Sequence, residues 1–261
     1  MKALVITPTL GVSPWLDEAM ASVAGLPVAC RHVLVCPAGV RAGLEQRFPQ
    51  VQVVAEPGGG MYAAINAGIA AAQDWDAFTY LNDDDVLCAG GTAAALQCLE
   101  RNSPADVVYG RVSLMDAHGA LLGWLPVAHQ PGDLAGLLAR GLVPLAQPGT
   151  WLRPALLKRL GGFDESFRSA GDLDLFSRAL AGSARFEYVP AEVARFRLHA
   201  GQLSKDEATG DAEKKRALAR WQDAPASFSA LLRFRRDNIP VYLDRIRRHG
   251  FVSMRRLYRG K

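Results

Sequence analysis

Cysteine, histidine and long apolar runs are scarce in this chain of 261 residues. The four cysteines form no CxxC pair and share no zinc-type spacing with a histidine, which argues against a disulfide scaffold and a zinc module. No apolar run approaches the roughly 18–20 residues that a membrane span requires. Because reduced, partly buried thiols are typical of a cytoplasmic protein, we expect a cytoplasmic location.

Three signatures of common enzyme classes and folds are also missing. The chain has no G-x-S-x-G elbow and no Walker-type phosphate loop, so serine hydrolases and P-loop enzymes have no support. It has no internal repeat. What it does have is 49% hydrophobic and 21% charged residues, a composition that suits one large or two small globular domains.

The net charge of +4 hides two regions of opposite sign. Residues 231–261 include ten basic and two acidic residues and carry +8, so the first 230 residues carry −4. Basic and apolar residues alternate in this tail at helical spacing, which predicts an amphipathic segment that binds an anionic membrane surface from the inner side. A solvated helix and a contact between copies of the chain are the alternatives. Nothing in the body resembles a nucleic-acid module, so we expect no nucleic-acid partner.

Short apolar runs alternate with stretches of helical pattern through the first 110 residues. Strands separated by helices of 10–15 residues imply crossover connections and a mostly parallel sheet covered on both faces. The sequence therefore predicts an α/β fold with a Rossmann-like sheet. The predicted strands are Ala3–Thr7, His32–Cys36, Val51–Ala55, Ala77–Leu81 and Val107–Val112.

The pattern loosens after residue 110. Short strands and helices follow, including two strands, Phe186–Val189 and Val193–Leu198, that Pro190 separates. From Lys205 onward the sequence is charged and helical. We expect a main domain over 1–205, with a first half over 1–110 and a second half over 111–205, and a basic helical extension over 206–261.

An acidic cluster, Asn82-Asp83-Asp84-Asp85, comes directly after the fourth predicted strand. Three adjacent carboxylates repel one another, so water or a cation must stabilise them. Ligands of open α/β sheets bind outside the carboxyl ends of strands. Hard oxygen ligands at this place suit Mg²⁺ or Mn²⁺, completed by substrate phosphates and water. A solvated acidic turn is the alternative.

A glycine-rich turn precedes the third predicted helix. Gly58, Gly60 and Ala63 fit the pattern G-x-G-x-x-A, and Asp83 follows about twenty residues later, as in dinucleotide-binding proteins. That fingerprint normally ends the first strand of its fold, whereas this one follows the third. An NAD-type oxidoreductase is therefore one hypothesis, and a plain glycine turn is the alternative.

Three further polar residues, Asp172, Asp174 and His199, are candidates for a site. Asp172 and Asp174 lie two positions apart at the start of a predicted helix, so at most one of them can face a site. An aspartate in a first helical turn is commonly a partner of the helix dipole. His199 is isolated in the sequence, and a lone histidine is more often structural than a ligand.

Four segments taken together resemble the family 2 glycosyltransferases with the GT-A fold, especially bacterial members that build surface polysaccharides. Their order and spacing over residues 3–205 are more specific than any one motif. They are Ile6-Thr7-Pro8-Thr9, Gly60–Ile69 (GMYAAINAGI), Tyr80–Asp85 (YLNDDD) and Gly161–Phe167 (GGFDESF) leading into Gly171–Phe176 (GDLDLF).

The resemblance implies a function and a set of roles. The chain would move a sugar from a nucleotide diphospho-sugar to a hydroxyl of a carbohydrate or lipid-linked acceptor, with inversion at the anomeric carbon. Asp172 would be the catalytic base, and Asp84, aided by His199, would bind Mg²⁺ or Mn²⁺. The nucleotide-sugar would lie against Thr7, Pro8, Thr9, Gly60, Asn66 and Asp83.

The sequence departs from the family pattern at three places. After the second strand, Cys36-Pro37-Ala38 stands where relatives often carry an acid that reads the base. Ala63 replaces a frequent acid in the glycine motif, and Asn82 replaces the first acid of a strict DxD. These changes leave the nucleotide open, and they keep a third hypothesis, a catalytically silent subunit of an assembly, in play.

Overall fold

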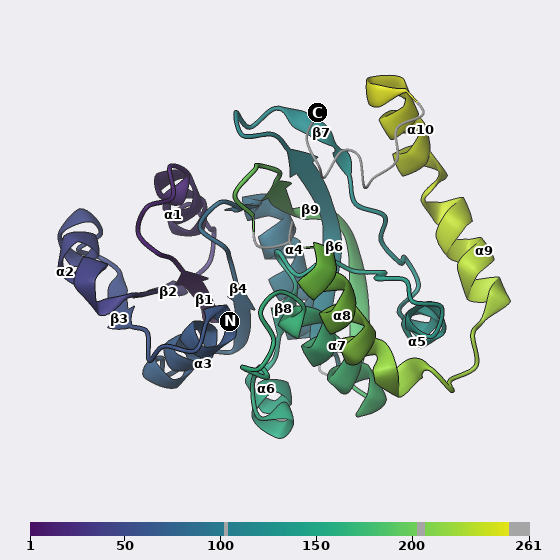
Figure 1. Cartoon of the computed structure of the whole chain (residues 1–261), viewed down its shortest axis with the longest axis horizontal. Helices are drawn as coiled ribbons and strands as arrows, with labels where there is room; N and C mark the ends of the chain where they lie inside the picture. The colour runs from purple at the N-terminus through teal and green to yellow at the C-terminus, as the bar shows by residue number, and fades with distance from the viewer. Residues whose placement is uncertain (102–103, 203–206, 251–261) are drawn as a thin grey trace.

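The computed structural model describes residues 1–101, 104–202 and 207–250. Residues 203–206, which include the predicted domain boundary, and residues 251–261 of the basic tail lie outside the described residues. Figure 1 shows a central twisted sheet with helices on both faces and the last helices along one edge.

The first four strands form the parallel half of the sheet, in the order β3-β2-β1-β4. Leu4 and Ile6 of β1 face one apolar core, and Ala3 and Val5 face the other, as the two-residue repeat of a strand buried on both faces requires. The elements are β1 (Ala3–Pro8), α1 (Leu16–Ala24), β2 (Cys30–Cys36), α2 (Ala38–Arg47), β3 (Gln52–Ala55), α3 (Met61–Ala71), β4 (Ala77–Tyr80), β5 (Val86–Leu87) and α4 (Ala89–Arg101).

The second half continues the sheet in the order β4-β8-β6-β9-β5. The long strands β6 and β9 pair in parallel, whereas the short strands β5, β7 and β8 pair antiparallel. The predicted α/β class, with a mostly parallel sheet flanked by helices, is confirmed. The elements are β6 (Val107–Met115), β7 (Leu121–Trp124), η1 (Pro131–Asp133), α5 (Leu134–Leu138), β8 (Trp151–Leu152), α6 (Pro154–Leu160), α7 (Gly171–Ala181) and β9 (Phe186–Arg197).

The predicted break at Pro190 is wrong, because β9 runs through it as one strand. The register between β6 and β9 shifts between Tyr109 and Arg111, so the irregularity absorbs the residue that cannot donate to the ladder. Gly110 lies opposite this shift, and a Cβ there would come within 2.5 Å of Val193. The bulge and the glycine together let the chain continue where the sequence favours a stop.

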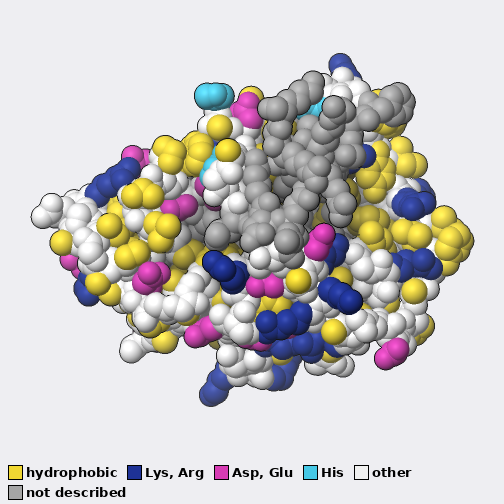
Figure 2. All heavy atoms as spheres, in the orientation of Figure 1, with side chains coloured by type: hydrophobic (Ala, Val, Ile, Leu, Met, Phe, Trp, Pro, Cys, Tyr) yellow, Lys and Arg dark blue, Asp and Glu magenta, His cyan; other side chains and the backbone are white. Residues whose placement is uncertain are grey.

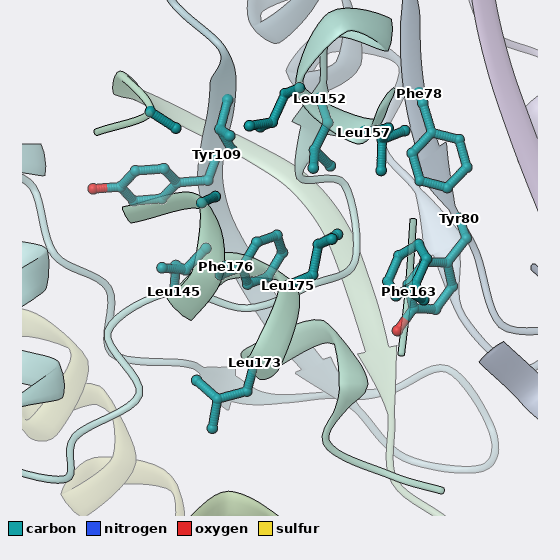
Figure 3. Close-up of a cluster of buried hydrophobic side chains, with 14 of the residues drawn as sticks. Phe78, Tyr80, Tyr109, Leu145, Leu152, Leu157, Phe163, Leu173, Leu175 and Phe176 are labelled. Atoms are coloured by element: carbon teal, nitrogen blue, oxygen red, sulfur yellow. The ribbon is translucent and has the colours of Figure 1, made fainter. Parts of the chain in front are cut away.

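The larger apolar core lies between the sheet and the helices α3, α5, α6 and α7. Figure 3 shows its aromatic centre, where Phe78 and Tyr80 of β4 approach Phe163, and Tyr109 of β6 lies near Phe176 of α7. The rings of Tyr62 and Phe163 stack at 5.5 Å between centroids. This packing fixes the N-terminal end of α7 relative to β4.

The predicted helical extension is confirmed for residues 207–250. It consists of α8 (Glu207–Leu218), η3 (Ala219–Trp221), α9 (Phe228–Asp237) and α10 (Ile239–His249). Helix α8 packs on α7, α9 packs on α5, and α10 lies beside β7 (Figure 1). No helix of the described residues is long and apolar enough to cross a membrane.

Candidate active site

The chain order of the sheet reverses beside β1, which lies between β2 and β4. Such a switch point opens a crevice at the carboxyl ends of the strands, where ligands of α/β proteins bind. Thr9 follows β1 and Asp83 follows β4. The Thr9 hydroxyl donates to Oδ2 of Asp83 at 2.5 Å, and Ser13 Oγ donates to the Asp83 backbone carbonyl at 3.0 Å. Two segments 74 residues apart in sequence therefore meet at this crevice.

Thr7 and Pro8 form the last residues of β1, and their surroundings differ. The Thr7 side chain is fully buried, and its hydroxyl lies 2.9 Å from Nε2 of His32 on β2. Burial lowers the pKa of His32 to about 3, so this pair is uncharged at neutral pH. Pro8 is partly exposed at the end of the strand. Thr7 thus supports the strand end, while Pro8 and Thr9 border the crevice.

The three adjacent carboxylates turn to three different partners. Asp83 meets Thr9, Asp84 meets His199, and Asp85 accepts the backbone N–H of Arg197 at 2.9 Å. Burial raises the pKa of Asp83, which the Thr9 hydrogen bond opposes. Burial and the neighbouring charge of Asp84 raise the pKa of Asp85 well above its usual range. The acidic turn therefore joins the ends of β1, β4 and β9, and only part of it is free for a ligand.

Asp84 and His199 form the most polar part of this crevice. Oδ2 of Asp84 lies 2.8 Å from Nε2 of His199, and the side chains are 15% and 17% exposed. The imidazole is held from two sides, because its Nδ1 accepts the Gly201 N–H at 3.2 Å and its ring packs against Trp15 at 4.4 Å. Because Nδ1 accepts a hydrogen bond, Nε2 carries the ring proton and donates it to Asp84, and this pair is partly exposed.

The buried side chain of Arg197 stabilises this arrangement. Its guanidinium is 1% exposed and donates to the backbone carbonyl of Asp84 at 2.8 Å, to that of Asp116 at 3.2 Å and to Glu18 at 2.5 Å. A buried arginine with a hydrogen-bond partner for each of its three guanidinium nitrogens has a fixed position. It ties β9 to the acidic turn and to the end of β6.

The donor set at Asp84 and His199 fits a divalent cation. A carboxylate oxygen and an imidazole nitrogen 2.8 Å apart lie close enough to bind one ion at about 2.0–2.2 Å, but Nε2 would first have to lose the proton that it donates to Asp84, and the ring would change tautomer and give up the Gly201 N–H. Within the described residues, no three side chains of His, Cys, Asp or Glu come together as a complete metal site. The described residues therefore supply two such ligands here, and phosphate oxygens and water would supply the rest.

A second polar position lies at the N-terminus of α7. Asp172 is largely buried, and its Oδ1 accepts the Leu173 N–H at 2.8 Å and lies 3.5 Å from the Tyr62 hydroxyl. Burial raises the pKa of Asp172 to about 6, although these hydrogen bonds act in the opposite direction. A carboxyl with a pKa near neutrality can accept and release a proton under ordinary conditions.

Tyr80 links the two polar positions. Burial raises its pKa well above the usual value, and the charges of Asp172 and Asp85 both contribute to the shift. The rings of Tyr80 and Tyr62 both pack against Phe163, at 5.6 and 5.5 Å between centroids, and the Tyr62 hydroxyl lies 3.5 Å from Asp172. Asp172 therefore lies near the end of β4 that leads into the acidic turn.

The expectation that only one of Asp172 and Asp174 can face a site agrees with the structure. Asp174 is 5% exposed and pairs with Arg178 at 2.7 Å and with Arg220 at 3.3 Å. Both of its oxygens are therefore occupied by cations of α7 and η3. Asp172 has no such cation among the described residues.

Gly60 and Asn66 lie on the neighbouring helix α3 and its entry. Gly60 has a φ of 98° and open space at the position of a Cβ, so the backbone at the start of α3 is accessible. The amide of Asn66 is used internally: its nitrogen donates to the Phe163 carbonyl at 2.9 Å, and its oxygen accepts the Phe163 N–H at 3.0 Å. Asn66 thus positions the loop before α7, and a direct contact with a nucleotide stays a prediction.

The sequence gives no hint of Glu213, which holds the other side of that loop. Its carboxylate accepts the backbone N–H groups of Arg168, Ser169 and Ala170 at 2.7–3.0 Å. Although partial burial acts to raise it, these hydrogen bonds lower the pKa of Glu213 below its usual range. Helix α8 therefore fixes the entry to α7, two residues before Asp172.

The raised pKa of Asp172 predicts a cost to stability. The carboxyl group is harder to ionise in the folded chain than in the unfolded one, so its ionisation lowers the free energy of unfolding. This loss of stability grows as the pH rises from about 4 to 6 and is complete above about pH 6. Asp172→Asn should therefore raise the free energy of unfolding at pH 8 by on the order of 2 kcal/mol and change it little near pH 4. Urea denaturation at the two pH values measures this.

Asp174→Asn is the matched control. It removes a buried carboxylate on the same helix, but this one neutralises Arg178 and Arg220, so the substitution should destabilise the protein at pH 8. A destabilised Asp172→Asn at pH 8 would contradict the environment described for Asp172.

We compared the chain with known proteins by sequence and by structure. No family model matches the chain, and no curated protein matches it in sequence. Solved structures do match it. The S. aureus TarS fragment 1–349 in complex with UDP-GlcNAc superposes with a TM-score of 0.65 at 17% identity, over 98% of this chain and 77% of that one. A longer TarS structure matches at 18% identity with a TM-score of 0.62, over 98% of this chain and 44% of that one.

A second protein gives the same result. The mannosyltransferase PcManGT from Pyrobaculum calidifontis, in complex with GDP-Man and Mn²⁺, superposes with a TM-score of 0.60 at 16% identity, over 92% of this chain and 75% of that one. TarS is likewise a glycosyltransferase. The chain therefore has a glycosyltransferase fold, in agreement with the resemblance in its sequence.

Proposed function

We propose that this protein is a metal-dependent inverting glycosyltransferase of family 2 that moves a hexosyl-type sugar from a nucleotide diphospho-sugar to an acceptor hydroxyl. The proposal rests on two neighbouring polar positions within a glycosyltransferase fold. Asp84 and His199 form one partly exposed pair, and Asp172, with a pKa near neutrality, lies close to the same end of β4. The two solved relatives bind UDP-GlcNAc and GDP-Man.

The donor would lie along the crevice at the carboxyl ends of β1 and β4. Pro8 and Thr9 border the nucleotide, with Thr7 supporting the strand end behind them, and Asp83 meets the ribose or sugar side. The start of α3 at Gly60 offers exposed backbone N–H groups and the positive end of a helix dipole, which favour phosphate. Asn66 would act by holding the loop that leads to Asp172.

Asp84 and His199 would hold Mg²⁺ or Mn²⁺. Bound there, the cation would supply positive charge beside the negative charge that grows on the departing diphosphate. The carboxylate and imidazole are already placed by Arg197 and Trp15, and the contact of Nδ1 with the Gly201 N–H would be given up when Nε2 binds the ion. PcManGT, one of the structural relatives, was solved with Mn²⁺.

Asp172 would remove the proton of the acceptor hydroxyl as that oxygen attacks the anomeric carbon. The new C–O bond forms on the face opposite the breaking bond to the diphosphate, so the configuration inverts. The proton moves to Oδ of Asp172, and the electron pair of the broken bond leaves with the diphosphate. Donor and acceptor held in line supply a further large share of the rate, because effective molarities of oriented reactants reach about 10⁵–10⁸ M.

Two observations weigh against the dinucleotide hypothesis. The glycines that fit its fingerprint follow β3, which is the edge strand of the sheet, rather than β1 at the switch point. The strand at the switch point ends instead in Pro8 and Thr9.

A silent assembly subunit would bind a donor or a partner without releasing nucleotide, so a measurement of turnover distinguishes it from the enzyme. The acceptor we propose is a carbohydrate or lipid-linked hydroxyl in cell-surface polysaccharide or glycolipid synthesis.

The rate of transfer should depend on the ionisation of Asp172. The base works only as a carboxylate, so turnover should rise with pH, level off above about pH 6 and fall about tenfold for each unit below it. Initial rates of nucleotide release between pH 4.5 and 8.5 give the profile. In Tyr62→Phe, which loses a hydrogen bond that lowers the pKa of Asp172, the acidic limb should move to higher pH. A profile flat between pH 5 and 7 would remove Asp172 from the role.

A panel of ligands tests the proposed donor class. UDP- and GDP-sugars should raise the melting temperature of the full chain in the presence of Mn²⁺ and lose much of that effect in EDTA. NAD(H) should not raise it. Stabilisation by NAD(H) and by none of the nucleotide-sugars would favour the oxidoreductase hypothesis instead.

A further inference from the structure

Helices α9 and α10 are fixed to the body of the protein by one face. The side chain of Asn238, between the two helices, pairs with both backbone groups of Val127 at 2.9–3.0 Å. Arg233 forms an ion pair with Asp133 at 2.5 Å, and Phe234 is buried against the larger core. His249 lies 2.6 Å from the carbonyl of Leu122 on β7. The opposite face of both helices therefore has a fixed orientation.

That opposite face is apolar to an unusual degree. Four of the large apolar side chains that stand exposed among the described residues lie on it, and they are 50–64% exposed. Their spacing of four, seven and four positions places them in one stripe along the two helices. They are Phe228, Leu232, Ile239 and Leu243. Figure 2 shows apolar and basic side chains side by side at this edge of the molecule.

Two residues of the stripe, Leu232 and Ile239, help to line a shallow, open groove of about 680 Å³. Its lining residues are Leu232, Arg235, Arg236, Ile239, Tyr242 and Arg245. Nε of Arg245 is buried and makes no hydrogen bond to any described residue, and its guanidinium lies 5.4 Å from the centre of the Tyr242 ring. Arg235 and Arg245 both lie close enough to Tyr242 to oppose the rise of its pKa that burial causes. We call this surface the outer face. It consists of Phe228, Leu232, Arg235, Arg236, Ile239, Tyr242, Leu243 and Arg245.

The composition of the outer face decides between partners. Arg235, Arg236 and Arg245 lie beside the apolar stripe, whereas Arg233 is paired with Asp133 on the face that is fixed to the body. In a symmetric contact with a second copy, arginine would oppose arginine, which repels. Nucleic acid would neutralise the arginines and leave the apolar stripe in water. An anionic lipid surface offers negative head groups and an apolar layer at the depth of the stripe.

We propose that the outer face of α9 and α10 binds an anionic phospholipid membrane surface, with the apolar stripe inserted and Arg235 and Arg245 at the head groups. Binding does not depend on sugar transfer. Its consequence for the proposed reaction comes through β7, which lies beside α10. The hairpin of β6 and β7 turns at Asp116, whose carbonyl contacts Arg197 beneath the acidic turn. A membrane-bound α10 would hold the candidate active site near a lipid-linked acceptor.

Co-sedimentation of the full chain with vesicles tests this proposal. One set of vesicles is phosphatidylcholine alone, and the other contains phosphatidylglycerol as well. The wild-type chain should sediment with the anionic vesicles, and rising salt should weaken the binding. Because each arginine near such a surface adds about fivefold to binding, Arg235→Gln with Arg245→Gln should reduce it about 10- to 30-fold. Leu232→Gln with Ile239→Gln should reduce it at least as much.

Two control variants make the same chemical changes elsewhere. Val12→Gln removes a side chain that is 79% exposed in the loop after β1. Lys158→Gln with Arg159→Gln removes two exposed positive charges from α6. Both should bind the anionic vesicles as the wild type does, and circular dichroism should show that every variant is folded.

Two outcomes would overturn the proposal. The first is equal recovery of the wild-type chain with anionic and neutral vesicles. The second is binding to anionic vesicles that the outer-face variants retain, which would assign the interaction to another part of the chain. If Leu232→Gln with Ile239→Gln instead dissociates a dimer in sedimentation equilibrium without any change in vesicle binding, the outer face is a contact between copies.

Discussion

Asp172→Asn is expected to reduce turnover by about 10²–10⁴-fold, the usual contribution of a general base, while the affinity for nucleotide-sugar stays within about twofold. The substitution keeps the shape of the side chain and the oxygen that accepts the Leu173 N–H. It removes only the capacity to take a proton. Nucleotide release measures turnover, and calorimetry measures binding of the donor.

Asp223→Asn is the control for that experiment, because it removes one exposed carboxylate from the loop after η3. It should leave both quantities unchanged. The expected gain in the stability of Asp172→Asn at pH 8 makes the result sharper, since a loss of turnover in a more stable protein cannot come from unfolding. Unchanged turnover in Asp172→Asn would show that another group takes the proton.

Asp84→Ala is expected to abolish the part of donor binding that depends on the metal. Loss of groups that only support a metal ligand typically costs about 10–100-fold in metal affinity, so loss of a ligand should cost at least that much. In Mn²⁺ the variant should bind nucleotide-sugar no better than the wild type does in EDTA. The fold should survive, because Arg197 donates to the backbone carbonyl of residue 84, which the substitution retains.

His199→Ala provides a second variant at the same position. If both side chains hold one ion, the loss in the double variant should be much smaller than the sum of the two single losses. Titration of the nucleotide-sugar with and without Mn²⁺ in all three variants gives the coupling. Binding that still depends on Mn²⁺ in Asp84→Ala would contradict the assignment of the metal.

The periodic parts of the sequence predicted most of the fold. Strands β1 to β4 and β6 were expected from short apolar runs, because strands buried on both faces read as continuous apolar stretches, whereas the two-residue strand β5 was not expected. The strand through Pro190 was missed for a physical reason. Its continuity depends on the register shift opposite Gly110, which is a property of the pairing and not of the local sequence.

The candidate site likewise contains some residues that the sequence indicates and others that it does not. Asp83, Asp84 and Asp172 stand out in the sequence because acidic residues gather at element ends there. The groups that hold them do not stand out. Arg197 meets Asp84 across 113 residues, Tyr62 meets Asp172 across 110, and Glu213 meets Ser169 across 44. Such contacts arise from the arrangement of distant elements, so one sequence without its fold does not reveal them.

The central claim is that the crevice between β1 and β4 binds one nucleotide diphospho-sugar together with a divalent cation. Calorimetric titration of UDP- and GDP-sugars into the full wild-type chain measures this most directly. The account predicts saturation at one donor per chain in Mn²⁺ and at least about tenfold weaker binding in EDTA. Absence of binding by every nucleotide-sugar in Mn²⁺, or binding that is equally strong in EDTA, would contradict it.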